Sequence, residues 1–261
     1  MNYIYYSSVF FWLLCAFIGL SIGSFINVVV YRLPLMIVNN TQRQFNLYYP
    51  ASHCTCCLQS LRWYENIPLL SWLALKGKCR HCHQVISIRY LCGEALFMLI
   101  TLFSAWICPD ISSLSAAMAL SAYLLALSQI DIQHQLLPDS LTLSLLWLGL
   151  IWHLLPGSVS LSDAVCGAIA GYLSLWVIYH LFRFITGTEA LGYGDFKLLS
   201  ALGAWLGWQQ LPLLVLVASL MGITISMIIY LRKGRVNKAL PFGPFLSLAG
   251  WFLFYFSFIT H

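Results

Sequence analysis

Hydrophobic residues make up 61% and charged residues 8% of this 261-residue chain, whereas soluble domains average about 45–50% and about 25%. So few polar residues could not cover the surface of a soluble protein, and the composition therefore indicates a polytopic membrane protein. The formal net charge of +5 comes from 13 basic and eight acidic residues, few enough for each acid to be considered separately.

Eight apolar runs predict transmembrane helices. The first run is too long for the core of a signal peptide and no lysine or arginine precedes it, so we expect a retained helix rather than a cleaved leader. The sixth run is too short to cross a hydrocarbon core of about 30 Å without tilting or borrowing flanking residues. The runs are 9–31, 90–107, 114–130, 141–155, 164–184, 198–208, 211–231 and 242–259.

All 13 lysines and arginines fall on one side of the predicted membrane. If the N-terminus lies outside, they occupy the cytoplasmic segments 32–89, 183–197 and 232–241, as the positive-inside rule requires. The net charge therefore reports topology, and we expect contacts with membrane lipid and none with nucleic acid. The pattern predicts an all-α multi-pass protein of about eight transmembrane helices, with a first helix (1–31), a cytoplasmic cysteine domain (32–89) and a transmembrane core (90–261).

Two CxxC pairs in the large cytoplasmic segment predict a structural metal site. The pairs, separated by 21 residues, are Cys54 with Cys57 and Cys79 with Cys82. Four thiolates at this spacing suit one tetrahedral zinc ion per chain, and stable disulfides are disfavoured in the cytoplasm. The alternative is a set of free or transiently oxidised thiols. Other residues that could compete as ligands are Cys56, His53, His81 and His83.

Two acids stand at the predicted cytoplasmic membrane boundary. Asp131 ends the third apolar run, and Asp195 opens the sixth in Gly192-Tyr-Gly194-Asp195, where the glycines allow a helix break and close backbone approach. An acid at such a boundary is costly unless it is paired or functional. Two carboxyl groups that share one proton provide an acid and a base, which can activate a water for attack on a peptide carbonyl.

Other charged residues have supporting or structural interpretations. Asp139 precedes the fourth run and is expected to be a helix N-cap. Glu94 lies about one turn inside the second run and is the strongest rival for a catalytic role, whereas Glu189 and Lys197 flank Asp195 closely enough to tune it. Of the remaining acids, Glu65 lies in the cysteine segment, Asp110 in an outside turn and Asp163 at the start of the fifth run.

Seven stretches together carry a family resemblance: 19–34, 52–57, 63–68, 78–82, 130–139, 192–199 and 241–244. In order and spacing they resemble the bacterial type IV prepilin peptidases, which are membrane aspartic proteases of the GxGD class. The resemblance implies that Asp131 and Asp195 form the catalytic pair and that Asp139 is a secondary acid. It also implies a location in the bacterial inner membrane.

The resemblance further implies the substrates and a second reaction. The substrates would be type IV prepilins or type II secretion pseudopilins, cut on the cytoplasmic face after a glycine that ends a short basic leader. Similar enzymes often N-methylate the new N-terminus with S-adenosylmethionine. Gly77, at a position that the family associates with methylation, is present here.

Two other classes of function remain open on the residues alone. Paired boundary acids could serve a proton- or cation-coupled transporter. Such a transporter would more often show an internal repeat with matched broken helices, and only one break, at 192–195, is found. The third class is an inactive membrane scaffold whose zinc domain binds a partner.

Overall fold

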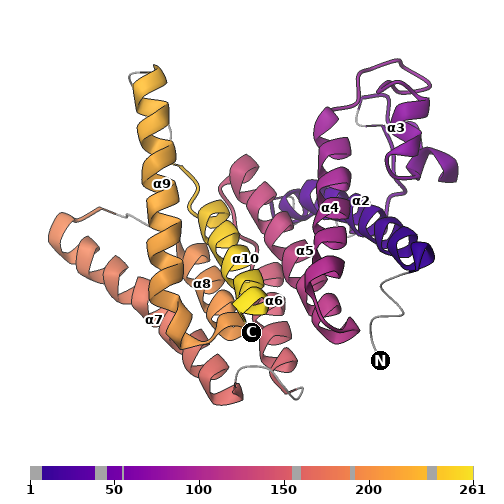
Figure 1. The fold of residues 1–261 in the computed structure, drawn as a ribbon. Helices are drawn as coiled ribbons and strands as arrows, with labels where there is room; N and C mark the ends of the chain where they lie inside the picture. The colour runs from indigo at the N-terminus through magenta and orange to yellow at the C-terminus, as the bar shows by residue number, and fades with distance from the viewer. Residues whose placement is uncertain are drawn as a thin grey trace. The chain divides into compact units, whose positions relative to one another are not determined.

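The computed structural model describes residues 8–38, 46–54, 56–154, 160–188, 192–233 and 240–260. Their regular secondary structure is helical, as Figure 1 shows. Two isolated β-bridges, His53 with Ser60 and Lys78 with Val85, accompany the helices in these ranges, which contain no strand. The prediction of an all-α fold is confirmed.

Each of the eight predicted apolar runs coincides with a helix. Five helical segments are long and apolar enough to cross a membrane: α2 (Val9–Val38), α4 (Ile88–Ile107), α5 (Ile111–His134), α7 (Leu161–Thr186) and the segment Trp208–Lys233, which joins η2 (Trp208–Gln210) to α9 (Leu211–Lys233). The others are η1 (Trp63–Asn66), α3 (Leu70–Ala74), α6 (Asp139–Trp152), α8 (Tyr193–Leu206) and α10 (Gly243–Thr260). A multi-pass membrane protein is confirmed, whereas the count of eight crossings stays a prediction.

The chain divides into two compact units, Met1–Ala122 and Tyr123–His261. The first unit holds α2, the cysteine segment (residues 46–87) and α4, and the second holds α6 to α10. The sequence-based division into 1–31, 32–89 and 90–261 stays a prediction.

In the first unit, α2 and α4 pack closely enough to frame the cysteine segment. A Cβ atom added to Gly23 would lie 2.9 Å from the Cα of Glu94. Beside this contact, Asn27 donates a hydrogen bond from Nδ2 to the carbonyl of Tyr90 over 3.0 Å. Small residues allow membrane helices to approach in this way, and a polar side chain adds a specific tie.

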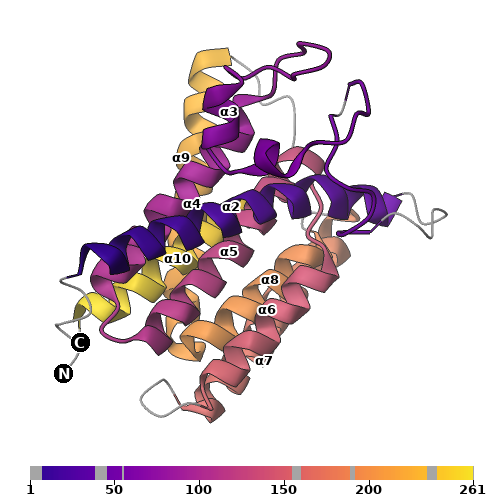
Figure 2. The same ribbon diagram turned by 90° about the vertical axis from the view of Figure 1, so that its right-hand side faces the viewer.

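In the second unit, α8 is the central helix and every residue but one from Asp195 to Leu206 is buried. Figure 2 shows α6, α7 and α8 side by side. Gly167 of α7 faces Gly203 of α8 with no room for a side chain on either, and Trp205 donates from Nε1 to the carbonyl of Leu145 in α6 over 2.9 Å. The short sixth apolar run is therefore a helix enclosed by protein, and it begins at Tyr193, ahead of the predicted start.

Candidate functional site

Asp131 lies in the last turn of α5 and is held by the start of α10. Its side chain is buried, and its Oδ2 atom accepts a hydrogen bond from the backbone N–H of Gly243 over 3.0 Å. A Cβ atom at position 243 would lie 2.6 Å from the same oxygen. Only glycine therefore fits between the carboxyl group of Asp131 and the first turn of α10, whose free N–H groups and dipole favour a negative charge.

Asp195 lies in the first turn of α8, 64 positions further along the chain. It is also buried, and its backbone N–H donates to the carbonyl of Gly192, the extended N-cap residue of the helix. A Cβ atom at Gly194 would lie 2.7 Å from the Cβ of Leu137. The second glycine of the motif is thus required by close packing and not by an unusual backbone angle.

Leu137 connects the surroundings of the two aspartates. It packs against Gly194, next to Asp195, and against Gly243, which binds Asp131. The carboxyl groups of Asp131 and Asp195 are near enough to interact electrostatically. Neither forms an ion pair with a lysine or arginine among the described residues. The arrangement is a buried pair of acids without a cationic partner.

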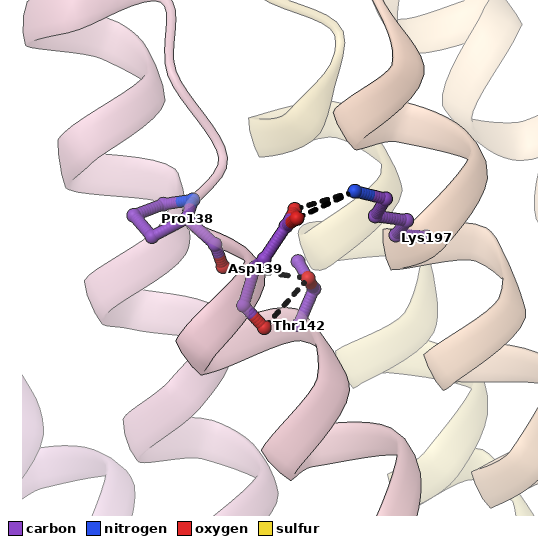
Figure 3. A network of polar contacts seen from close by, with 4 residues as sticks. All are labelled: Pro138, Asp139, Thr142 and Lys197. Carbon is purple, nitrogen blue, oxygen red and sulfur yellow. Dashed lines mark hydrogen bonds and ion pairs between the residues drawn. The ribbon is translucent and has the colours of Figure 1, made fainter. Parts of the chain in front are cut away.

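Lys197 does not pair with Asp195 but with Asp139, as Figure 3 shows. Its Nζ atom lies 2.6 and 2.7 Å from the two carboxylate oxygens of Asp139. The predicted N-cap role of Asp139 is wrong by one position, because Pro138 occupies the N-cap and Asp139 is the first residue of α6. Because Asp139 does not cap the helix, its carboxylate pairs with Lys197 of α8 instead. The ion pair connects the start of α6 to the turn that carries Asp195.

Of the other predicted supporting acids, Glu94 belongs to the first unit. Its Oε2 atom accepts a hydrogen bond from the backbone N–H of Leu69 over 2.8 Å, and it lines a cavity of that unit. Glu189 lies outside the described residues.

The four cysteines of the two CxxC pairs come together in the first unit. All four sulfur atoms lie within 4.8 Å of one another, with 3.7 Å between Cys54 and Cys82 and 4.0 Å between Cys57 and Cys79. Thiolates placed tetrahedrally about 2.3 Å from a zinc ion are about 3.8 Å apart. The cluster therefore has the size of a metal site. Cys56 and the histidines considered as alternative ligands are not members of this group.

The two CxxC turns share two backbone features. In each, the N–H of the first cysteine donates to the carbonyl of a glutamine five residues on, Gln59 after Cys54 and Gln84 after Cys79. The fourth residue after each first cysteine, Leu58 or His83, has a positive φ. A repeated Cys-x-x-Cys-x-Gln pattern marks both turns in the sequence. Sequence reasoning missed this repeat because it compared only the cysteine spacing.

The thiols of the cluster differ in acidity. Backbone hydrogen bonds, the strongest from Cys57 and the next from Cys56, lower the pKa of the Cys54 thiol to about 6. A lowered pKa favours the thiolate, which is the form of cysteine that binds metal. In the same cluster a backbone hydrogen bond from Gln84 lowers the pKa of the Cys82 thiol, but desolvation and contacts with the other three sulfur atoms outweigh it and raise that pKa to about 12.

Comparison with known proteins decides the family. The sequence model of the bacterial peptidase A24 N-terminal domain matches residues 17–108, and that of the type IV leader peptidase family matches residues 118–227. This chain belongs to the type IV leader peptidase family. The resemblance seen in the sequence motifs is confirmed.

Curated relatives are similar in sequence to this family member over nearly its full length. A prepilin leader peptidase/N-methyltransferase of Pectobacterium carotovorum subsp. carotovorum is 49% identical and covers 90% of this chain and 89% of its own. Proteins of the same name from Stutzerimonas stutzeri and Pseudomonas aeruginosa are each 46% identical and cover 91% and 90% of this chain and 88% and 86% of their own. No solved structure matches the chain. These comparisons give the transporter alternative no support.

Gly77, the position that family resemblance associates with methylation, has a clear steric requirement. Its φ is +67°, and a Cβ atom there would lie 2.7 Å from the Trp72 ring. Its N–H donates to the carbonyl of Trp72, and its carbonyl accepts from the N–H of Ile86. Any larger residue would shift Trp72 and the start of the second CxxC turn.

Two further residues of this leader peptidase family member were not assigned roles from the sequence. Gly243 was noticed only as part of Pro241-Phe-Gly-Pro244, and Leu137 only within the stretch 130–139. Gly243 binds Asp131 from more than 100 positions along the chain, and Leu137 packs against Gly194 and Gly243 beside the aspartates. The motifs at 130–139 and 241–244 drew attention to these segments. A motif alone does not say which side chains its residues contact.

Proposed function

We propose that Asp131 and Asp195 are the catalytic pair of a leader peptidase that acts on type IV prepilins or type II secretion pseudopilins. The observation that carries the proposal is the meeting of two buried acids from α5 and α8 without a described cationic partner. The names of the relatives, prepilin leader peptidase/N-methyltransferase, agree with it.

The pair hydrolyses a peptide bond with general acid–base chemistry. Like charges in one desolvated site repel each other, so the pair holds one proton between its two carboxyl groups. The ionised member takes a proton from a water while the water oxygen attacks the peptide carbonyl. The protonated member then gives its proton to the leaving nitrogen, the C–N bond breaks, and the leader departs as a carboxylic acid.

The surrounding residues position this pair. Gly243 orients Asp131 through its N–H, and Gly194 lets the first turn of α8 lie close to Leu137. Gly192 is the N-cap residue whose carbonyl accepts a hydrogen bond from the N–H of Asp195. Asp139 and Lys197 hold α6 to α8 beside the reacting groups. Glu94 is not assigned to this reaction, and Glu189 keeps its proposed tuning role from its place before Asp195 in the sequence.

The proposed location of this chemistry is the cytoplasmic face of the bacterial inner membrane, and the one-sided distribution of lysines and arginines supports it. The N-terminus then lies outside, and the cysteine domain (32–89) and both aspartates face the cytoplasm, where a basic leader remains. The substrate's apolar helix lies in the lipid next to the transmembrane core (90–261).

We also propose a second reaction, transfer of a methyl group to the new N-terminus. The free amine attacks the methyl carbon of S-adenosylmethionine, the C–S bond breaks with its electron pair left on sulfur, and the amine loses a proton. S-adenosylhomocysteine is the other product. Gly77, which stands at the start of the second CxxC turn, belongs to the domain proposed for this step.

One zinc ion held by Cys54, Cys57, Cys79 and Cys82 is the proposed structural cofactor. The support is the sulfur spacing in the cluster and the matched backbone of the two turns. The ion would stabilise the cysteine domain, which is too small to fold well on its apolar residues alone. It supplies no step of the cleavage.

The test uses purified full-length protein in detergent, a prepilin and S-adenosylmethionine, with the products measured by mass spectrometry. We expect Asp131→Asn and Asp195→Asn each to abolish cleavage. Asp110→Asn is the matched control, because Asp110 caps α5 through Ser113 in the first unit and asparagine caps equally well. Full cleavage by either variant at position 131 or 195 would exclude the proposed pair.

A further inference from the structure

One buried hydroxyl group in α10 has no hydrogen-bond partner among the described residues. Ser247 is 3% exposed, and its Oγ atom does not use the carbonyl of Gly243, the acceptor that its own helix offers four residues back. Ser257 of the same helix, by comparison, donates to the carbonyl of Phe254 over 2.7 Å. Burying a hydroxyl group without a hydrogen bond is costly. The position of Ser247 therefore requires a partner that is not a protein group.

The helices α8 and α10 run in the same direction where they pack together. A Cβ atom added to Gly250 of α10 would lie 2.5 Å from the side chain of Leu202 in α8. Further along both helices, the rings of Trp205 and Phe254 have their centroids 5.8 Å apart. The contacts advance together along the two chains, so the starts of both helices lie at the same end of this seam between α8 and α10.

Ser247 lies on the face of α10 that borders this seam. Gly243 is about one turn before it and Gly250 about one turn after it, so the three residues share a face. That face meets Asp131 at Gly243 and α8 at Gly250. On α8, Asp195 stands about two turns before the residue that meets Gly250. The hydroxyl of Ser247 is thus about one turn from the end of the seam that holds both aspartates.

Helix geometry puts this hydroxyl within reach of Asp131 through one water molecule. Helical side chains lean toward the N-terminus, so that of Ser247 leans over Gly243, which has no side chain. Cβ positions four residues apart on a helix are about 5–6 Å from each other, and the Cβ position at Gly243 is 2.6 Å from Oδ2 of Asp131. A water with two hydrogen bonds of about 2.8 Å joins oxygen atoms up to about 5–6 Å apart.

We propose that Ser247 is a positioning residue that holds a buried water molecule against the carboxyl group of Asp131. The hydroxyl donates a hydrogen bond to the water, and the water donates one to the carboxyl group. Ordered waters with polar partners of this kind are part of a protein's structure, and their hydrogen bonds are nearly as favourable as direct ones. This water orients Asp131 and is distinct from the water that the reaction consumes. The inference rests on the proposed catalytic role of the aspartates.

The kinetic test compares Ser247→Ala with the wild type, as full-length protein in detergent with a prepilin as substrate. We expect kcat to fall at least about tenfold with KM unchanged, because a poorly oriented carboxyl group slows the chemical step and not binding. Ser247→Thr keeps the hydroxyl and should restore most of the rate. Ser257→Ala is the matched control in the same helix, because that hydroxyl already binds its own helix, and it should keep both constants.

Infrared spectroscopy of the same proteins reports the water link without any substrate. The carboxyl stretching bands of the pair are identified as those missing from the double variant Asp131→Asn/Asp195→Asn. Hydrogen bonding changes the stretching frequency of a carboxyl group, so Ser247→Ala should shift at least one of these bands. Ser257→Ala should leave them in place. Thermal melting shows whether each variant is folded, and Ser247→Ala should melt at the wild-type temperature or above, since it removes a polar group without a protein partner.

The outcomes separate this inference from the proposed function. A lower kcat, an unchanged KM and shifted carboxyl bands in Ser247→Ala support the water site. A wild-type kcat or unshifted bands overturn it, as does a Ser247→Thr variant that melts normally but cleaves as slowly as Ser247→Ala. A raised KM at unchanged kcat also overturns it and makes the hydroxyl a substrate contact. If Asp131→Asn and Asp195→Asn cleave fully, the proposed catalytic pair fails, whereas shifted bands in Ser247→Ala still support the water site.

Discussion

The two compact units each gather acids, but in opposite electrostatic surroundings. In the first unit, Glu65 and Glu94 line a cavity that also contains arginines and aromatic rings, and each glutamate accepts a backbone hydrogen bond. In the second unit, Asp131 and Asp195 are buried without a described lysine or arginine partner. Compensated acids suit binding of a charged ligand, whereas uncompensated acids must share a proton and therefore suit acid–base catalysis.

The comparison also separates two uses of glycine. Gly77 in the first unit is required by a positive φ and by the ring of Trp72. Gly194 and Gly243 in the second unit are required by the lack of space beside Leu137 and Asp131. The first kind shapes the turn that carries Cys79 and Cys82, and the second kind brings two chain segments near enough for their acids to interact.

The largest effect is expected from removing both acids of the second unit. The double variant Asp131→Asn/Asp195→Asn should lose at least about a thousandfold in cleavage rate, and no more than either single variant, because the two groups act as one unit. Single-turnover cleavage of a prepilin measures this. Additive losses would show that the aspartates act in separate steps.

Loss of the metal site should be the next largest effect and should be confined to the first unit. Cys79→Ser is expected to lose zinc, to lose S-adenosylmethionine binding and to make residues 46–87 sensitive to protease, since structural zinc contributes about 10 kcal/mol or more in small domains. Metal analysis and limited proteolysis measure these changes. Cys56→Ser is the matched control, because Cys56 is not in the cluster, and it should retain zinc. Cleavage that falls as far as in the aspartate variants would show that the two regions are not separable.

A smaller but specific effect is expected at Gly243. Gly243→Ala places a methyl group 2.6 Å from Oδ2 of Asp131, so the carboxyl group must move. Displacing a reacting group by about 1 Å can cost about a hundredfold in rate. The rate of leader cleavage should fall about a hundredfold, while S-adenosylmethionine binding is unchanged. Gly222→Ala is a suitable control, since an added Cβ meets only an ordinary contact with Phe245. Equal losses in both variants would contradict the positioning role.

The smallest effect is expected at the ion pair of Figure 3. The carboxylate of Asp139 is 60% exposed, and exposed ion pairs contribute about 1 kcal/mol or less. Asp139→Asn should therefore cleave within about fivefold of the wild type. A loss comparable to that of Asp195→Asn, measured in the same assay, would make Asp139 part of the catalytic machinery.

Most elements were predictable from the sequence because apolar runs of this length have few alternatives in a membrane protein. The eight runs all coincide with helices, and the cysteine spacing pointed to the four sulfur atoms that meet. The partners of individual charged groups were not predictable. Lys197 is two positions from Asp195 in sequence, but it pairs with Asp139, 58 positions away, because its side chain reaches from α8 to the start of α6.

The sequence alone determined the membrane class, the scarcity of acids and the two pairs of cysteines, since composition and local spacing are properties of the chain itself. Only the tertiary structure decided how the eight acids divide. It brought Asp131 to Asp195 and Gly243, assigned Asp139 to Lys197, and placed Glu65 and Glu94 in one cavity. The physical reason is that a carboxyl group's chemistry depends on its neighbours in space. For a helical membrane protein those neighbours come from helices that are far apart in the chain.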